Sequence, residues 1–421
     1  MKMVRREFLA AAAAAAAAQT APVRIGVVGT GGRGTSLLRT LLRMEQVAVP
    51  ALCDINRDNL ARAAGLVSKA GRPDPETYLD EEDYQRLMAR EDLDAILIAT
   101  PWELHTPMAV YAMRAGKYTA VEVPAALTLE ECWDLVSTSE QTGVPCMMLE
   151  NWSFLRPNLA VLKMIREGLL GEIVHCHCAH SHNCIYWYFD KEGNPRWSGQ
   201  HLLRRNADQY PTHSVGPVLS WMGINCGDAF ATLTSTATRS LGINNDFRKK
   251  FGPDHPAAKR AYRQGDIVTS VVKTARGNSI VINNDMQLPR PYDNRWMIQG
   301  TEGLYDEARN AVYLAGRSPK HEQWEPFAPY QEKYDHAWWK QLQAGGPGSG
   351  HGGTDYLELK LFIDAVAART PPPIDVYDSV TMSVIIPLSE HSIASGGAPV
   401  PCPDFTRGKW KTRKPAFAVG G

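Results

Sequence analysis

The stretch that most limits the fold of this chain is GTGGRG at residues 29–34, between an apolar run at 23–28 and a helix-like run at 35–44. Glycines in such a turn let the backbone approach a pyrophosphate at the helix N-terminus. A second apolar run, 47–53, leads into Asp54, and an acid at that point binds ribose hydroxyls and repels a 2′-phosphate. The pattern predicts a doubly wound parallel sheet of the Rossmann type that binds NAD rather than NADP.

Further apolar runs at 94–100, 118–123 and 145–149 alternate with helix-like segments and extend this sheet. A doubly wound sheet binds its ligand in the loops that follow the carboxyl ends of its strands. The residues that we expect beside the cofactor are Gly29, Gly31, Gly32, Arg33, Gly34, Asp54, Trp102, Glu103, Leu104, His105, Glu122, Val123 and Asn151.

The sequence pattern changes after residue 151. Strand-like runs separated by few helices predict an α+β domain with an open, mostly antiparallel sheet. We therefore expect an α/β protein with an NAD-binding domain at 22–151 and a substrate-binding domain at 152–350. A C-terminal helix and tail at 351–421 are expected to pack back on the first domain.

Composition excludes several classes of function. Lys+Arg and Asp+Glu each number 45, so there is no basic surplus that would favour a nucleic-acid partner. No apolar run reaches the roughly 20 residues of a membrane-spanning helix. The eight cysteines are sparse for a chain of 421 residues and form no disulfide framework.

The first 21 residues are typical of a targeting segment. Residues 4–19 read VRREFLAAAAAAAAAQ, in which twin arginines precede an apolar stretch and then small residues. This arrangement resembles a bacterial twin-arginine signal, with an alanine-rich N-terminal helix as the alternative. It predicts an exported, periplasmic or secreted protein that uses the twin-arginine export machinery. Because no cysteine follows the apolar stretch, we expect no membrane anchor.

The densest cluster of reactive side chains is HCHCAHSHNC at residues 175–184. On a strand, alternate residues share a face, so Cys176, Cys178, His180 and His182 would line one side. Four ligands along one extended strand cannot converge on a tetrahedral ion without sharp bending, so we expect no metal here. The cysteines could simply pack as small apolar residues. Our preferred interpretation puts His180 and His182 at the mouth of a substrate site.

A second group of candidates is YPTH at residues 210–213, which leads into an apolar helix. Tyr210 and His213 are both proton-transfer groups near a helix start. The alternative is that His213 only caps the helix or fills the core.

Several short motifs complete the pattern, namely WELH at 102–105, EVP at 122–124, LEN at 149–151, HGG at 351–353 and DFTRGKW at 404–410. Together with GTGGRG and YPTH they resemble glycoside hydrolase family 109, within the Gfo/Idh/MocA oxidoreductases, over most of the chain. The resemblance implies an NAD-dependent α-N-acetylgalactosaminidase. It adds Tyr210 to the NAD contacts and implies sugar contacts at His180, Ser198, Tyr210, Pro211, Thr212, His213 and Tyr292.

Three positions depart from the residues that the resemblance leads us to expect. Dehydrogenases of the superfamily usually have a proton-shuttling lysine where this chain has Val123, and valine cannot transfer a proton. His180 stands where the family usually has tyrosine, and Ser198 where it has arginine. These two changes predict altered sugar contacts, because serine cannot replace a planar bidentate donor.

The mechanism that the resemblance implies uses NAD without consuming it. The sugar is oxidised at C3, the C2 proton becomes acidic, the aglycone is eliminated, water adds, and C3 is reduced again. We expect His213 and Tyr210 to carry the proton transfers, with His182 as a further candidate. An exported enzyme that restores its cofactor in each cycle needs no external supply of NAD, which agrees with Val123.

The alternatives are an NAD-dependent sugar dehydrogenase, a sugar epimerase or lyase of the same superfamily, and a non-catalytic sugar-binding protein. The expected partner is a small-molecule glycoside. An open sheet face would also allow a homo-oligomer.

Overall fold

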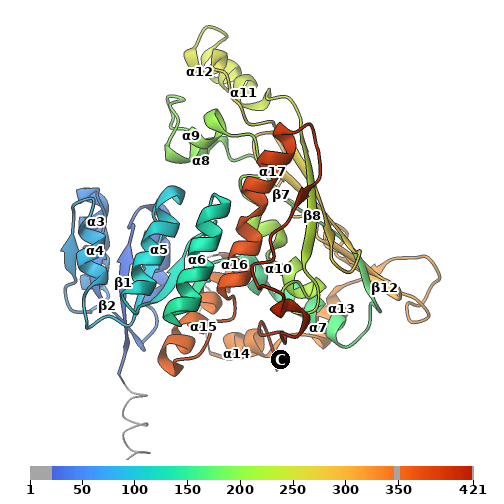
Figure 1. Ribbon diagram of the computed structural model, residues 1–421, viewed down its shortest axis with the longest axis horizontal. Coiled ribbons are helices and arrows are strands. Elements are labelled where there is room, and N and C mark those ends of the chain that lie inside the picture. Colours follow the sequence, from blue (N-terminus) through green and yellow to red (C-terminus); the bar gives the residue numbers. More distant parts are fainter. Residues whose placement is uncertain (1–20, 346–350, 420–421) are drawn as a thin grey trace, which may run out of the picture.

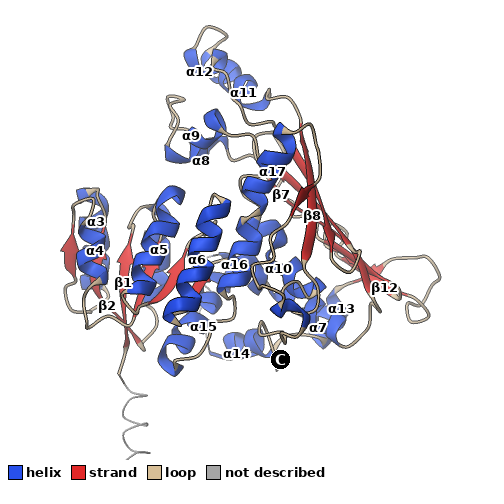
Figure 2. Cartoon of the chain, in the orientation of Figure 1, coloured by secondary structure: helices blue, strands red, loops and turns tan. Residues whose placement is uncertain are grey.

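The computed structural model describes residues 21–345 and 351–419, so the proposed export signal lies outside the described residues apart from Ala21. Two sheets dominate the described chain, and helices pack between and around them (Figures 1 and 2). No helix within the described ranges is both long and apolar enough to span a bilayer.

The first sheet is parallel throughout and has the strand order β3-β2-β1-β4-β5-β6. Its strands are β1 (Val23–Val28), β2 (Val47–Cys53), β3 (Glu76–Tyr78), β4 (Ala95–Ile98), β5 (Tyr118–Val121) and β6 (Cys146–Met148). The order reverses between β1 and β4, which is where a doubly wound sheet opens a crevice for its ligand. The predicted doubly wound sheet is confirmed.

The helices of this domain are α2 (Gly32–Leu41), α3 (Arg57–Lys69), α4 (Asp83–Met88), α5 (His105–Arg114) and α6 (Leu129–Thr142), with the short turn η1 at Trp102–Leu104. Two of them, α3 and α6, begin at side-chain caps. Thr128 and Glu131 form a reciprocal capping box at the start of α6, and left-handed Gly143 ends that helix.

The second sheet has nine strands in the order β14-β13-β12-β11-β7-β10-β9-β8-β15. Its strands are β7 (Ile173–Ser181), β8 (Phe230–Ala237), β9 (Val268–Thr274), β10 (Ser279–Asp285), β11 (Met297–Gly300), β12 (Gly303–Asp306), β13 (Ala311–Leu314), β14 (Glu325–Pro326) and β15 (Val400–Pro401). Only β7 and β10 run parallel, so the predicted mostly antiparallel sheet is also confirmed.

Helices cover one face of this second sheet. Helix α10 (Thr212–Met222) contacts β7, and α17 (Ile385–Ala394) contacts β8 (Figure 1). Val174 and Val271 on the sheet are 44% and 39% exposed. The remaining helices are α7 (Arg156–Arg166), α8 (Ile185–Tyr188), α9 (Trp197–Arg204), α11 (Gly242–Phe251), α12 (Pro256–Lys259), α13 (Ala328–Lys333), α14 (Ala337–Gly345), α15 (Thr354–Ala368) and α16 (Val376–Ser383), with the short turns η2 (Asn151–Phe154), η3 (His351–Gly353) and η4 (Lys409–Lys411).

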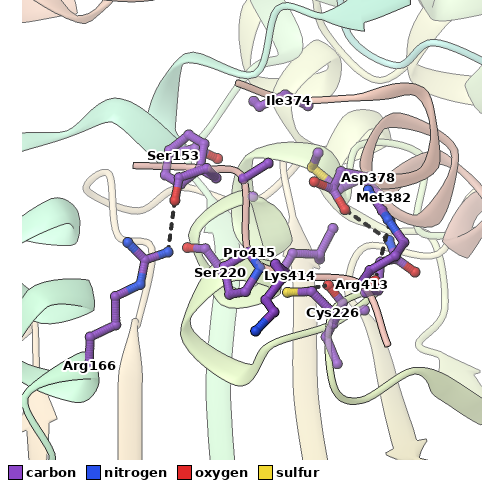
Figure 3. A pocket seen from close by; sticks show the side chains of 16 residues that line it. Ser153, Arg166, Ser220, Cys226, Ile374, Asp378, Met382, Arg413, Lys414 and Pro415 are labelled. Atoms are coloured by element: carbon purple, nitrogen blue, oxygen red, sulfur yellow. Dashed lines mark hydrogen bonds between the residues drawn. The ribbon is translucent and has the colours of Figure 1, made fainter. Parts of the chain in front are cut away.

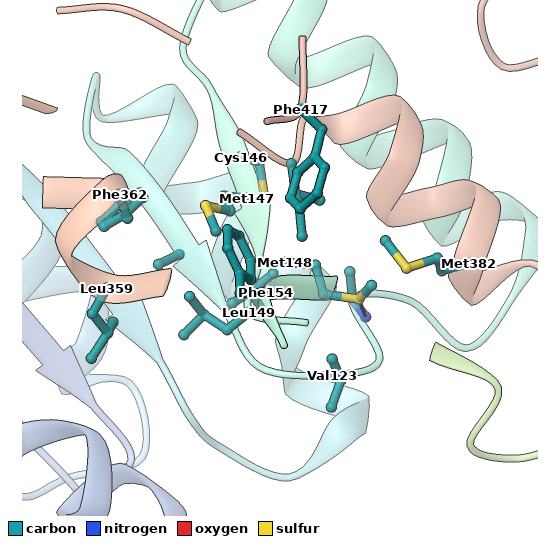
Figure 4. Packing of buried hydrophobic residues seen from close by; sticks show 14 of the residues in the cluster. Val123, Cys146, Met147, Met148, Leu149, Phe154, Leu359, Phe362, Met382 and Phe417 are labelled. Carbon is teal, nitrogen blue, oxygen red and sulfur yellow. Dashed lines mark hydrogen bonds between the residues drawn. The ribbon is translucent and has the colours of Figure 1, made fainter. Parts of the chain in front are cut away.

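One apolar core joins the two sheets. Phe154 packs near β6 with Phe417 of the C-terminal tail, Met382 of α16 and Phe362 of α15 (Figure 4). Each such side chain contributes about 1.5–3 kcal/mol when fully buried. The C-terminal segments thus hold the loops after β1, β5 and β6 in a fixed relation to the second sheet, and those loops form the candidate site.

Candidate functional site

The glycine turn after β1 has a packed side and an open side. Gly29 has a φ of 84°, and a Cβ on Gly34 would lie 1.8 Å from the carbonyl oxygen of Gly29, so only glycine allows this close approach of strand and helix. A Cβ on Gly32 would meet nothing within 4 Å. The N-terminus of α2 is therefore accessible to a phosphate group, as a dinucleotide site requires.

Asp54 is fixed beside this turn at the end of β2. Its Oδ2 accepts hydrogen bonds from the Thr30 backbone N–H at 2.6 Å and the Thr30 hydroxyl at 3.0 Å. Its Oδ1 accepts from the Asn56 backbone N–H at 2.8 Å. The acid therefore has the position and the rigidity expected of a ribose ligand, and these residues fit NAD.

Arg33 ties together three loops of the cofactor crevice. Its guanidinium contacts Glu122 Oε1 at 2.6 Å and Asp355 Oδ2 at 2.8 Å, and Asn151 Nδ2 donates to Asp355 Oδ1 at 2.8 Å. Burial opposes the charge, but the two carboxylates outweigh it and raise the pKa of Arg33 above its ordinary value. Asp355, in the first turn of α15, was not predicted from sequence.

The WELH segment contributes two kinds of residue. Trp102 is buried and stacks on Tyr210 with ring centroids 5.7 Å apart, Leu104 is 41% exposed, and Glu103 Oε1 lies 3.1 Å from His201 Nε2. His105 is different, because its two ring nitrogens lie 2.7 Å and 2.9 Å from the carbonyl oxygens of Pro124 and Thr100.

His105, which is predicted as a cofactor contact, is held in place by the protein itself. The ring is 1% exposed, and burial lowers its pKa, so it is neutral. It links the loops of Pro124 and Thr100 through its two ring nitrogens. Val123, also buried, precedes Pro124 across a cis peptide bond and presents only an apolar side chain.

The strongest candidate for a base is His213, in the first turn of α10. Its Nδ1 lies 2.8 Å from Glu150 Oε1, and its Nε2 lies 3.4 Å from the Tyr210 hydroxyl. Because a carboxylate only accepts hydrogen bonds, Nδ1 carries the proton, and the Nε2 lone pair accepts from the Tyr210 hydroxyl. Glu150 is fully buried and its Oε2 accepts from the Ser153 backbone N–H at 2.8 Å. Burial raises the pKa of Tyr210, so the phenol stays protonated.

The predicted sugar contacts on β7 and on the loop after β10 come together around this dyad. The His180 ring centroid lies 5.3 Å from that of His213 and 5.2 Å from that of Tyr210. The His182 and Tyr292 centroids are 4.8 Å apart. Burial, reinforced by the neighbouring imidazoles, lowers the pKa of both His180 and His182. Five residues predicted from separate stretches therefore form one imidazole–phenol cluster.

The other predicted sugar contacts lie differently. Pro211 and Thr212 are buried at the start of α10, and the Thr212 hydroxyl has no hydrogen-bond partner within the described chain. Ser198 is 1% exposed, and its hydroxyl donates to the Trp187 carbonyl at 3.3 Å. Ser198 therefore bonds to the backbone of α8. Its neighbour Trp197 lies beside the site, with its ring centroid 5.3 Å from that of Trp102.

The cysteines and histidines of β7 face two ways. Cys176 and Cys178 are buried in the core, whereas His175 bonds Ser279 and His177 bonds Asn283 on the opposite face. Across residues 21–345 and 351–419, no group of three or more His, Cys, Asp or Glu side chains is arranged to hold a metal ion.

A separate cavity is lined by residues of α7, α10, α16 and the C-terminal tail (Figure 3). Ser153, Arg166, Asp378 and Arg413 line it, and burial raises the pKa of Asp378 to about 7. Gly216 forms part of its wall, where a Cβ would lie 1.9 Å from Glu150 Oε2. This wall packs against the back of the His213–Glu150 dyad.

Sequence comparisons match the two halves of the chain to two family models. "Glycosyl hydrolase 109, C-terminal domain" matches residues 154–412, and "Oxidoreductase family, NAD-binding Rossmann fold" matches residues 23–150. A glycosyl hydrolase family 109 protein of Stenotrophomonas maltophilia is 41% identical, with 100% of this chain and 99% of the relative covered. An α-N-acetylgalactosaminidase of Tannerella forsythia is 42% identical, with 94% and 89% covered.

Comparison with solved structures shows the same fold. An NAD-binding oxidoreductase from Klebsiella pneumoniae superposes with a TM-score of 0.69 at 18% identity, covering 91% of this chain and 100% of that one. Levoglucosan dehydrogenase in complex with NADH and L-sorbose superposes with a TM-score of 0.68 at 20% identity and the same coverage.

Proposed function

Because this chain belongs to glycosyl hydrolase family 109 and is an NAD-dependent glycoside hydrolase, we propose that it cleaves glycosides by transient oxidation at C3. The observation that carries the proposal is the His213–Glu150 dyad, which reaches Tyr210 at 3.4 Å and adjoins the cofactor crevice, while Val123 occupies the position of the dehydrogenase lysine.

The cofactor would be held by the glycine turn at 29–34, Asp54 and the Arg33 network. When bound, NAD supplies a reversible oxidation at a carbon of the sugar. The protein contributes the position of the sugar and the groups that move its protons.

His213 is suited to take the proton of the reacting hydroxyl at Nε2. The imidazolium that forms is stabilised by Glu150, whose carboxylate is already hydrogen-bonded to Nδ1. Tyr210 remains a phenol and donates to the same oxygen as charge develops on it. A positioned base of this kind contributes about 10²–10⁴-fold to a rate.

The later steps follow from the ketone on the sugar. The carbonyl acidifies the C2 proton, loss of that proton expels the aglycone from C1, and water then adds at C1. A pair of carboxylates that flanks the scissile bond is not needed, and Glu150 is committed to His213. We propose an exported enzyme whose substrate is an N-acetylgalactosaminide-like glycoside, with sugar contacts altered at His180 and at Trp197 and Ser198, the first residues of α9.

The test is a panel of p-nitrophenyl glycosides in both anomeric series, assayed with the purified protein and NAD⁺. We expect release of p-nitrophenol from at least one α-glycoside, with no net accumulation of NADH. Accumulation of one NADH for each substrate molecule oxidised would instead identify a dehydrogenase. Absence of any release across the panel would favour an epimerase, a lyase or a sugar-binding protein.

A further inference from the structure

Two histidines at the end of β7 form a directly contacting pair. His180 Nε2 and His182 Nε2 lie 3.1 Å apart. The sulfur of Cys184 lies against the His182 ring, 3.3 Å from Nδ1 and 3.1 Å from Nε2. Burial raises the pKa of Cys184 to about 12, so it remains a thiol and gives this ring a weakly polar neighbour.

The second nitrogen of His180 has no hydrogen-bond partner. The ring is 4% exposed, and Nδ1 is buried without a partner anywhere in the described chain. A buried polar atom that lacks a partner costs about 1–3 kcal/mol. Since the ring lies beside His213 and Tyr210, a ligand in this cluster would relieve that cost.

The contact between two Nε2 atoms requires that they share one proton, because one nitrogen must donate and the other accept. When His180 donates from Nε2, its Nδ1 carries a lone pair and is basic. A proton taken up at Nδ1 then lets the Nε2 proton move toward His182, and the charge spreads over both rings.

The reaction needs such a group, if the proposed function holds. His213 is already assigned to the hydroxyl proton, and its Nδ1 is bonded to Glu150. A second base must remove the C2 proton of the keto sugar. We propose that the His180–His182 pair is this base, with His180 Nδ1 as the accepting atom and His182 as a positioning residue that shares the charge.

The step balances in atoms and electrons. The C2–H bond breaks and its proton bonds to His180 Nδ1. The electron pair becomes the second bond between C2 and C1, and the C1–O bond to the aglycone breaks. The aglycone oxygen takes a proton from solvent. After water adds at C1, the same imidazole returns a proton to C2.

The protonation state of the pair suits this task. Burial and the nearby imidazole of His213 lower the pKa of both rings, so both are neutral near pH 7 and ready to accept a proton. The groups that face them are His213, Tyr210, Tyr292 and Cys184, and Tyr210 and Tyr292 are held in their neutral forms by burial.

The experiment follows C2 directly in the full-length enzyme loaded with NAD. The released sugar is analysed for deuterium at C2 after turnover in D₂O, and kcat is compared for C2-protonated and C2-deuterated p-nitrophenyl substrates. The variants are His180→Gln and His180→Ala, with His175→Ala on the opposite face of the same strand as the matched control.

We expect His180→Gln to lower kcat by about 100-fold, with NAD still bound, a larger C2 isotope effect and a rate of deuterium incorporation at C2 that falls by the same factor. In His182→Gln, we expect kcat to stay high over a narrower range of pH than in wild type. His175→Ala should behave as wild type. The proposal is overturned if wild type incorporates deuterium and both His180 variants do so at a similar rate, or if they change KM alone. Release of p-nitrophenol by wild type without any C2 exchange would overturn the proposed function itself. It would also overturn the role proposed for the His180–His182 pair.

Discussion

At the scale of single residues, the central pair is His213 and Glu150. The hydrogen bond from Nδ1–H to the buried Glu150 carboxylate, 2.8 Å long, keeps the Nε2 lone pair available to accept a proton. Both residues therefore act as one unit, and loss of either removes the same base.

We predict that His213→Ala lowers kcat by about 10²–10⁴-fold and leaves the affinity for NAD within the range of wild type. Glu150→Gln should lower kcat less, because the amide can still accept from Nδ1–H without stabilising the imidazolium. Activity assays measure kcat, and titration with NAD followed by fluorescence measures the affinity for NAD, so the two effects are separated. Loss of NAD binding, with activity restored at high NAD⁺, would show that His213 serves the cofactor and not the proton transfer.

Asp208 gives a prediction about stability. It is 1% exposed, and burial raises its pKa to about 7, against about 3.9 for an ordinary aspartate. Between these two values the folded chain holds a proton that the unfolded chain has lost, so the contribution to stability falls as pH rises.

Asp208→Asn removes this titration. The free energy of unfolding of the variant minus that of wild type should therefore increase from pH 4 to pH 7, by at most about 4 kcal/mol. Above pH 7 this difference should level off. Urea unfolding of both proteins at several pH values measures the difference. A constant difference across that range would show that Asp208 is ionised in the folded protein.

At the scale of elements, the tie between α2 and α15 joins segments that are far apart in sequence. Arg33 and Asp355 are 322 residues apart, yet their contact fixes the start of α15 against the glycine turn. We predict that Asp355→Ala weakens NAD binding about tenfold, since a hydrogen bond to a charged group is worth about 1.5–3 kcal/mol and Arg33 is partly exposed.

The measurement is the Kd for NAD, with kcat at saturating NAD as the second readout. Thr128→Ala, which removes the capping box of α6, is the matched control, because it lowers stability by about 1 kcal/mol without touching the crevice. An unchanged Kd in Asp355→Ala would show that the tie is only structural.

The elements also show what sequence alone can predict. The strand expected around Cys176 and Cys178 is present as β7 (Ile173–Ser181), because alternation and apolar runs are local signals. Glu150 and Asp355 were missed as site residues because their roles depend on partners brought close by the whole fold. The buried position of His105 likewise depends on Pro124 and Thr100, whose carbonyls no local pattern places beside the ring.

At the scale of the whole molecule, one apolar core holds the cofactor loops and the imidazole–phenol cluster in a fixed relative position. The contact between Trp102 of the first domain and Tyr210 of the second is an example. We propose that the chain is exported by the twin-arginine pathway, which carries folded proteins, so that NAD can be bound before export. We propose that the enzyme retains this NAD and restores it in every cycle.

The most direct test of this account is the fate of the hydrogen at C3. A p-nitrophenyl glycoside deuterated at C3 is turned over in H₂O with no NAD⁺ beyond that bound to the enzyme. The account predicts many turnovers per enzyme, an isotope effect on kcat, and a released sugar that keeps its deuterium at C3. Turnover that stops after one equivalent, or a product that has lost the deuterium, would contradict it.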